Sequence, residues 1–303
     1  MTTTASSATA LGRPDPSGPR LGVWERVRWR GLCVAARHGV DVVSTVRQGP
    51  AAGLRFGSRN ASADYASGRN ERTVQEAVAG HLRPGSVFFD VGSNVGFFAL
   101  LAARAVGPRG HVVAVEPMPD NVAALRRNLE RNHVPHEQVG AIATATATAG
   151  AGRSGAAPMG TVTVVEAAAG PTPGRGRLGL SAHPGGNALE VTGAPGDLTG
   201  FVEVDLVTID GLVGDGRVPP PDLVKIDTES GEAEVLDGMG DVLASHRPSV
   251  LVEVDAATVA EVDAKAAAVE RRLGAAGYRI GRLPPSYPNR RWQVVHLWAS
   301  PPR

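Results

Sequence analysis

The chain has 303 residues, of which 42% are hydrophobic and 20% are charged, values typical of a globular protein with a sizeable core. Its formal net charge of +1 creates no field that would attract nucleic acid, and its 4% of aromatic residues offers no platform for stacked bases. The single cysteine, Cys33, excludes a disulfide within the chain and a cysteine-based zinc site, so we expect a reducing, cytoplasmic compartment.

The sequence gives no sign of a membrane-embedded segment. A spanning helix needs roughly 20 uninterrupted apolar residues, but the most apolar window, residues 87–106, contains Asp90 and Asn94. Residues 2–10 lack the apolar core of a secretory signal. We therefore expect no membrane partner.

The first part of the chain is predicted to be an appendage. Residues 1–22 are rich in Thr, Ser, Ala, Gly and Pro without an apolar period, which predicts a disordered tail. Residues 24–46 interleave apolar and arginine side chains at helical spacing, and a second helix is predicted over residues 72–82. We therefore assign residues 23–83 to an N-terminal helical extension and residues 84–303 to the main domain.

Strands and helices alternate regularly through the main domain, a pattern that predicts an α/β fold with a doubly wound, mostly parallel sheet. Such sheets bind ligands at the carboxyl ends of their strands. Strands are predicted at residues 86–91, 111–116, 161–166, 222–227, 248–254, 277–282 and 292–298, and helices at 95–106, 118–132, 231–243 and 260–274.

Two stretches interrupt this alternation. Residues 135–160 are low in complexity and predict a disordered insertion between a helix and a strand. Residues 168–200 are rich in Gly and Pro and precede an alternating strand at 201–207. The second stretch is either a loop that covers a substrate or a long connection, and the pattern does not decide between them.

The segment from Val87 to Gly96 joins a buried strand to a helix through a tight turn. A dinucleotide fold places Gly-x-Gly-x-x-Gly here to approach a diphosphate, but Asn94 takes the position of the middle glycine. What remains is Asp90, Gly92 and Gly96, with a carboxylate at the strand end that would repel a diphosphate. We therefore expect a ligand that carries a cationic amino group.

A second acid follows at the end of the next strand. Glu116 precedes Pro117 and lies 20 residues after Gly96, the spacing at which doubly wound folds place an acid that accepts the hydroxyls of a ribose. Asp90 and Glu116 together suit one adenosyl ligand, and Ser93 and Asn94 lie in the turn between them. The alternative is that both acids cap helices or lie in solvent.

These segments, together with residues 208–210 and 225–236, occur in the order seen in the FkbM family of methyltransferases, which the chain resembles from roughly residue 65 to 298. The resemblance implies a Rossmann-like class I methyltransferase that uses S-adenosyl-L-methionine, usually to methylate a hydroxyl of a sugar or of a secondary metabolite such as a polyketide. Ser230 and Gly231 depart from the family pattern close to the expected acceptor site.

The segment 223–232 is predicted to deliver Asp227 to the carboxyl end of a strand beside the first one. We expect Asp227 to face the cofactor or the acceptor. Glu229 follows in the turn, and Glu232 lies in the first helical turn, where the helix dipole alone would stabilise an acid. Lys225 is expected to point away from Asp227's face of the strand or to extend along the sheet, in a structural rather than a catalytic role. Asp210 is expected to cap the short helix that follows it.

Catalysis of methyl transfer needs an oriented acceptor and a base for its proton. The candidate bases are Asp227, Glu229, Glu232 and His183, the last in a stretch where a solvated histidine is the simpler interpretation. The three acids would alternatively bind Mg²⁺, although we expect no resident metal. His296 is predicted to belong to the core or the sheet surface.

Two other functions remain compatible with the sequence. A nicotinamide-dependent oxidoreductase can use the same architecture, but Asn94 disfavours it. A non-catalytic protein that retains the cofactor pocket is suggested by Ser230 and by the low-complexity stretch. The favoured interpretation is an O-methyltransferase that acts on a small molecule.

Overall fold

The computed structural model describes residue 31 and residues 40–57, 64–140, 146–148, 158–181, 188–189, 198–286 and 293–302. The predicted tail over residues 1–22, most of the amphipathic stretch over 24–46 and His183 lie outside these ranges. Among the described residues, no helix combines the length and the apolar character that crossing a bilayer requires.

The main sheet has nine strands in the described part of the chain, and six consecutive ones are parallel. The predicted doubly wound, mostly parallel sheet is therefore confirmed. In sheet order the strands are β14 (Arg279–Arg282), β15 (Gln293–Ser300), β13 (Ser249–Ala256), β12 (Leu223–Ile226), β3 (Val87–Val91), β4 (His111–Val115), β7 (Thr161–Glu166), β5 (His136–Gly140) and β6 (Thr146–Thr148), and the parallel run extends from β13 to β5.

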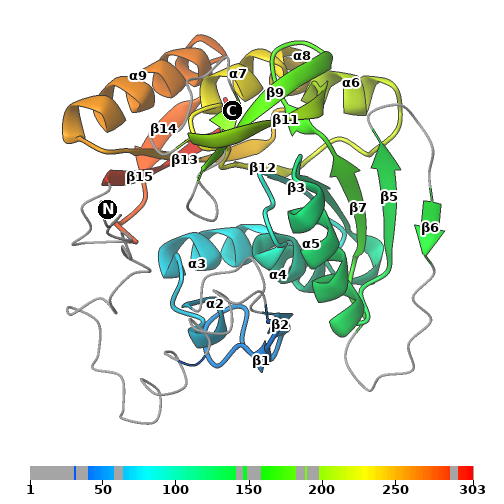
Figure 1. The fold of residues 1–303 in the computed structure, drawn as a ribbon. Helices are drawn as coiled ribbons and strands as arrows, with labels where there is room; N and C mark the ends of the chain where they lie inside the picture. Colours follow the sequence, from blue (N-terminus) through cyan, green and yellow to red (C-terminus); the bar gives the residue numbers. More distant parts are fainter. Residues whose placement is uncertain are drawn as a thin grey trace, which may run out of the picture.

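Helices cover both faces of the sheet, because the parallel strands are apolar on both sides. Alternate residues of β3 show this: Phe88 packs into one core and Phe89 into the other. Figure 1 shows the two groups of helices on opposite sides of the sheet. One group is α3 (Arg72–His81), α4 (Phe97–Val106) and α5 (Pro119–Arg131), and the other is α6 (Ile209–Gly214), α7 (Glu232–Asp237), α8 (Gly240–Ser245) and α9 (Val259–Ala275).

The order of the strands reverses at β3, which has β4 on one side and β12 on the other. The chain runs outward from β3 through β4 to β5 and β6, inserts β7 between β4 and β5, and then returns to form β12 and β13 on the opposite side. A crevice forms at the carboxyl ends of the strands where such a reversal occurs. The fold thus places the ends of β3, β4 and β12 around one position.

The single helix predicted at residues 231–243 is wrong, since α7 ends at Asp237 and α8 begins at Gly240. Gly238 lies between them against the backbone of Gly170, so close that a Cβ atom at this position would be 2.1 Å from the Gly170 carbonyl oxygen. The break frees the amino end of α8 for a cap, and the carboxylate of Asp210 accepts hydrogen bonds there.

The N-terminal part of the described chain is not wholly helical. The predicted helix over 24–46 is wrong for its described end, because β1 (Val43–Thr45) pairs antiparallel with β2 (Arg55–Gly57). The helix predicted at 72–82 is confirmed as α3, preceded by the short α2 (Asp64–Ser67). Asn128 in α5 accepts a hydrogen bond from the Gly57 backbone N–H at 2.9 Å, which attaches the hairpin to the main domain.

The two irregular stretches contain strands that the sequence pattern did not indicate. Residues 136–140 are strand β5, which pairs parallel with β7, so disorder is wrong for this part of the predicted insertion. The second stretch contributes to a four-stranded sheet in the order β10, β9, β11, β8. Its strands are β8 (Ala168–Ala169), β9 (Gly174–Ser181), β10 (Ala188–Leu189) and β11 (Leu198–Val207), the last of which confirms the strand predicted at 201–207.

Candidate functional site

A pocket lies at the carboxyl ends of β3, β4 and β12, where the strand order reverses. It brings together most of the residues that the sequence predicted for the site. Those that line it are Asp90, Gly92, Ser93, Asn94, Glu116, Pro117, Asp227 and Glu229. Gly96 and Glu232 do not line it, and His183 lies outside the described residues.

The turn after β3 depends on two glycines. Gly92 has a φ of +79°, and a Cβ atom there would lie 1.8 Å from the carbonyl oxygen of Asp227, so only glycine fits between the ends of β3 and β12. Gly96 has a φ of +84° and packs against Leu125 of α5, where a Cβ atom would be 2.8 Å from the Leu125 Cγ. Gly96 thus allows close packing of α4 and α5 and contributes to the site indirectly.

Asp90 projects from β3 into the pocket and is almost fully buried, with 1% of its surface exposed. Neither carboxylate oxygen makes a hydrogen bond of normal geometry to the described residues. Burial raises the pKa of Asp90 to about 7, although the positive charge of Lys225 on the neighbouring strand lowers it. A buried carboxylate without a donor is costly, which indicates that a ligand completes its environment.

Glu116, at the end of β4, is held by three donors from the protein. The backbone N–H of Asn94 donates to Oε2 at 2.8 Å, and the Met118 N–H and the Asn121 Nδ2 donate to Oε1 at 3.1 and 3.0 Å. Burial raises the pKa of Glu116, and these hydrogen bonds lower it. A carboxylate offers about four acceptor positions, so one on Oε2 is left for a ligand hydroxyl.

Glu116 therefore combines both interpretations that the sequence allowed. It orders the turn after β3 and the loop before α5 through backbone N–H groups, and it also faces the pocket. A ligand with two neighbouring hydroxyls would have to share Oε1 with Asn121 or displace its amide.

Lys225 points toward Asp227, so the expectation that it points away is wrong. Residues i and i+2 of a strand share a face, and the Lys225 Nζ donates to the Asp227 Oδ2 at 2.7 Å. Lys225 is only 2% exposed and also lies 4.8 Å from the centre of the Phe98 ring. Burial alone would lower its pKa, but Asp227 and Asp90 raise it, and the ammonium group stays charged at the floor of the pocket.

The turn between β12 and α7 has two successive residues in the left-handed region, Glu229 with a φ of 53° and Ser230 with a φ of 87°. Such backbone is costly for residues other than glycine and is typical of functional turns. Burial raises the pKa of Glu229, and the nearby carboxylates of Asp255 and Asp227 raise it further. Glu229 lines the pocket as a protonatable group.

Ser230 is the residue that departs from the family pattern, and its side chain turns toward α9. The Lys265 Nζ donates to the Ser230 Oγ at 2.7 Å and to the Asp255 carbonyl oxygen at 2.9 Å. This contact compensates for the left-handed backbone. Ser230 is not among the residues that line the pocket.

Glu232 is buried, and its carboxylate folds back over the same turn. Its Oε1 accepts hydrogen bonds from the backbone N–H of Ser230 at 3.0 Å and, at 3.3 Å, from the backbone and hydroxyl of Thr228. Burial raises the pKa of Glu232 to about 7, and its backbone hydrogen bond lowers it. Since it does not line the pocket, we assign Glu232 to holding the turn.

Asp210 caps a helix, but not the one predicted. The hydroxyl of Thr208 caps the amino end of α6, accepting from the Gly211 N–H at 2.9 Å. The Asp210 carboxylate instead accepts from the N–H groups of Asp241 and Val242 in α8, at 3.1 and 2.8 Å. Asp210 therefore joins two helices outside the pocket.

Several residues that line the pocket were missed in the sequence. Tyr65 of α2 stacks on Phe97 with ring centres 4.6 Å apart, and Glu71 precedes α3. Leu178 of β9 and Leu189 of β10 line the pocket from the small sheet, so the second irregular stretch does cover the site. Lys225 also lines the pocket, and its position two residues before Asp227 in the same strand could have indicated this. Tyr65, Glu71, Leu178 and Leu189 come from segments far from any motif.

The described residues contain one group of carboxylate and imidazole side chains close enough to hold a metal ion: Glu71, Glu253 and His296. It does not include the acids for which Mg²⁺ was the alternative, Asp227, Glu229 and Glu232. His296 is buried in the sheet as predicted, and its Nε2 lies 2.7 Å from the Glu253 Oε2. Burial and the Asp227 charge raise the pKa of Glu253 to about 8.

In the comparison with protein families, residues 90–280 match the Methyltransferase FkbM domain. This range includes Asp90, Glu116 and the segment around Asp227.

Two curated proteins illustrate the similarity. The hexuronic acid methyltransferase AglP of Haloferax volcanii is 29% identical over 62% of this chain and 64% of its own length. The 31-O-demethyl-FK506 methyltransferase FkbM of Streptomyces tacrolimicus is 31% identical over 57% of this chain and 66% of its own length. The matches thus span just under two thirds of these relatives.

A solved structure, that of Methyltransferase FkbM from Methylobacillus flagellatus KT, aligns with 72% of this chain and 44% of that chain, at 19% identity and a TM-score of 0.40.

Proposed function

Since this chain belongs to the family of methyltransferases with an FkbM domain, whose match covers more than half of its length, we propose that it is an S-adenosyl-L-methionine-dependent O-methyltransferase that acts on a hydroxyl of a small molecule. The observation that carries the proposal is the pair of buried acids, Asp90 and Glu116, at the ends of the neighbouring strands β3 and β4. Both line one pocket.

The residues present fit this cofactor. Asp90 offers a buried carboxylate that makes no hydrogen bond of normal geometry to the described residues, which suits the cationic amino group of a methionine moiety. Glu116 offers an acceptor for a ribose hydroxyl. At Gly92 a side chain would collide with the backbone of Asp227, and its absence lets the ends of β3 and β12 approach each other closely beside the pocket. Ser93, Asn94 and Pro117 complete this wall of the pocket.

The chain's own residues position the acceptor and receive its proton. S-adenosyl-L-methionine, when bound, supplies an electrophilic methyl group on a sulfonium. Most of the rate gain in such a displacement comes from holding the acceptor oxygen in line with that methyl group. Asp227 and Glu229 line the pocket beyond Asp90 and are the candidates to accept the hydroxyl proton, with Asp227 oriented by Lys225.

The class of acceptor follows from the walls of the pocket and from the relatives. Leu178 and Leu189 close the pocket from the small sheet and favour a partly apolar molecule rather than a polymer. The two curated relatives are named for a hexuronic acid and for 31-O-demethyl-FK506, which supports a sugar or a secondary metabolite. We expect the enzyme to act in the cytoplasm and not on nucleic acid.

Calorimetric titration with S-adenosylhomocysteine, and separately with NAD, tests the cofactor assignment. We expect S-adenosylhomocysteine alone to bind. Glu116→Ala should abolish binding, because the ribose loses its acceptor and the protein loses the hydrogen bonds that Glu116 accepts from Asn94, Met118 and Asn121. Glu130→Ala is the matched control, because it removes an exposed glutamate of α5, the helix that follows Glu116. Binding of NAD, or of neither ligand, would overturn the proposal.

Turnover separates an enzyme from a non-catalytic protein with the same pocket. We expect Asp227→Asn to bind S-adenosylhomocysteine as the wild type does, but to release none from S-adenosyl-L-methionine when supplied with a panel of hydroxylated sugars and metabolites. Asp215→Asn, which changes an exposed residue between α6 and β12 that does not line the pocket, should retain full turnover. Equal turnover in the Asp227 variant would remove this residue from the catalytic machinery.

A further inference from the structure

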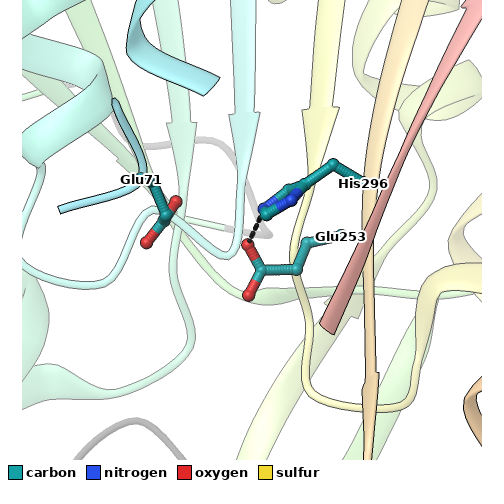
Figure 2. Close-up of side chains that lie close together, drawn as sticks. All are labelled: Glu71, Glu253 and His296. Carbon is teal, nitrogen blue, oxygen red and sulfur yellow. Dashed lines mark hydrogen bonds and ion pairs between the residues drawn. The ribbon is translucent and has the colours of Figure 1, made fainter. Parts of the chain in front are cut away.

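Two buried side chains, Glu71 and His296, and one partly buried side chain, Glu253, come from separate parts of the chain and meet beside the pocket. Glu253 in β13 and His296 in β15 are direct partners across the antiparallel pair, and Glu71 approaches them from the residue before α3. One potential ligand atom from each lies within 4.8 Å of the others. Figure 2 shows the three side chains converging from these segments, with His296 and Glu253 joined by the 2.7 Å contact.

From this geometry we propose that Glu71, Glu253 and His296 form a binding site for a divalent transition-metal cation. The proposal concerns residues outside both the cofactor motif and the three acids of the β12 turn. It is independent of the methyl-transfer assignment in its first step, which is binding of the metal itself.

The low exposure of this group makes its negative charge unfavourable in free energy unless a positive charge or a proton offsets it. His296 is 2% exposed and Glu71 is 7% exposed, and the side chain of Glu253 is 15% exposed, so the group has little contact with solvent. Carboxylates withdrawn from water need a cation, a proton or hydrogen-bond donors beside them. The nearby ammonium of Lys225 is paired with Asp227.

The backbone at Glu71 supports a role for its carboxylate in this group. Glu71 occupies the N-cap position of α3 in the left-handed region, with a φ of 46°, yet its side chain does not cap the helix. The Glu71 carbonyl oxygen accepts the hydrogen bond from the Gln75 N–H at 2.9 Å that begins α3, so the backbone of Glu71 starts the helix while its carboxylate is left for other contacts. The Asn70 Nδ2 donates to the Glu71 Oε1 at 2.7 Å and orients the carboxylate.

The donor set indicates the kind of cation. One imidazole nitrogen with two carboxylates suits Mn²⁺, Fe²⁺, Co²⁺ or Zn²⁺ better than Ca²⁺ or Mg²⁺, which prefer oxygen ligands alone. Three protein ligands also leave coordination positions for water or substrate. Glu71 lines the pocket, whereas Glu253 and His296 are not among its lining residues, so a molecule in the pocket would reach the cation on the Glu71 side. That the cation there holds the acceptor oxygen rests on the proposed function.

The first test uses the full chain, freed of metal with a chelator, and titrates it with Mn²⁺ in the absence of cofactor and acceptor. We expect one equivalent to bind, and pulsed electron paramagnetic resonance of the Mn²⁺-loaded wild type to show coupling to the nitrogen of one imidazole. This readout needs no variant, so it stands even if a substitution at the site impairs folding. Absence of binding, or binding without nitrogen coupling, would overturn the proposal.

Variants provide the second test. Glu253→Gln and His296→Asn should each weaken Mn²⁺ binding by about 100-fold or more. Glu76→Gln is the matched control, because Glu76 lies on α3 five residues from Glu71 but is exposed and pairs with Arg72 at the surface. Unchanged Mn²⁺ affinity in folded His296→Asn would equally overturn the proposal. Titration of the same samples with S-adenosylhomocysteine keeps failure of the metal site distinct from failure of the cofactor assignment.

Discussion

Asp90 is a carboxyl group buried beside an ammonium group and two other acids, and its ionisation should control the affinity for the cofactor. Its pKa is raised to about 7, chiefly by burial, so near neutral pH it exists in both forms. The cationic amino group of the cofactor binds the ionised form. As the pH falls from 8 to 6, we expect the affinity for S-adenosylhomocysteine to fall about tenfold, since the ionised fraction falls by that factor.

Calorimetry at pH 6, 7 and 8 checks this dependence, and the control is Asp263→Asn, which removes an exposed carboxylate of α9. Asp90→Asn should bind weakly at every pH. The stability of the free protein should change in the opposite sense. The folded state keeps the Asp90 proton up to about pH 7 while the unfolded chain loses it near pH 4, so stability falls as the pH rises through that window. A pH-independent affinity would contradict the assignment.

Ser230 carries a conformational cost that Lys265 offsets. At a φ of 87° a serine is strained and a glycine is not, but serine gains the hydrogen bond from the Lys265 Nζ at 2.7 Å. Ser230→Ala keeps the strain and loses the bond, so we expect a loss of about 1–2 kcal/mol in the free energy of unfolding. Ser230→Gly loses both and should be close to neutral. Urea denaturation compares them, and equal stability of the two variants would contradict this account.

For individual residues, the sequence predicted those that line the proposed cofactor side of the pocket, such as Asp90 and Glu116, and missed lining residues from other segments, such as Tyr65 and Glu71. Asp90 and Glu116 were predicted because both end apolar strands at a spacing that a doubly wound fold explains. The orientation of Lys225 was predicted wrongly, because residues two positions apart in a strand lie on the same face and Lys225 therefore points to the same side as Asp227. Glu71, Glu253 and His296 could not be predicted together, because their approach depends on the antiparallel register of β13 with β15 and on the path of the chain before α3.

Among the elements, α8 depends on a carboxylate from another helix. Asp210 follows Thr208 at the start of α6 but accepts from two N–H groups at the start of α8. Asp210→Ala should therefore lower the free energy of unfolding by about 1–2 kcal/mol, as loss of an N-cap does. Asp215→Ala, which removes an exposed partner of Arg217, should cost less than about 1 kcal/mol. Thermal and urea unfolding of both variants test the difference.

The elements that the pattern predicted correctly are those with strong apolar periodicity, such as β3, β4 and α5. Those it missed depend on pairing with distant partners. β5 is a short strand of mixed polarity that is defined by its position beside β7, and β9 by its pairing with β11. The break between α7 and α8 depends on the contact of Gly238 with Gly170, a contact between segments far apart in sequence.

For the whole molecule, the site joins the two halves of the sheet on either side of β3, so a ligand there should stabilise the entire fold. Saturation with S-adenosylhomocysteine at about 100 times its Kd should add about 2.7 kcal/mol to the free energy of unfolding. We expect the Tm to rise by several degrees in differential scanning calorimetry. Glu116→Ala should show no such rise, and a rise of equal size in that variant would contradict the assignment of Glu116.

The overall architecture was the most predictable property, because alternating strands and helices leave few arrangements for a parallel sheet. The location of the pocket followed from that topology. Its far wall did not, since it is built from α2, the residue before α3 and the small sheet, none of which the alternation determines.

The position of β15 has a consequence for how the protein is made. β15 follows β14 along the chain but inserts between β14 and β13, so the sheet on that side is completed only when synthesis has passed residue 300. Glu253 therefore leaves the ribosome before its partner His296, 43 positions later in the chain. Until then β13 exposes an open edge that can pair wrongly. Nascent chains stalled before β15 should thus engage chaperones and bind no Mn²⁺, whatever the state of the cofactor wall.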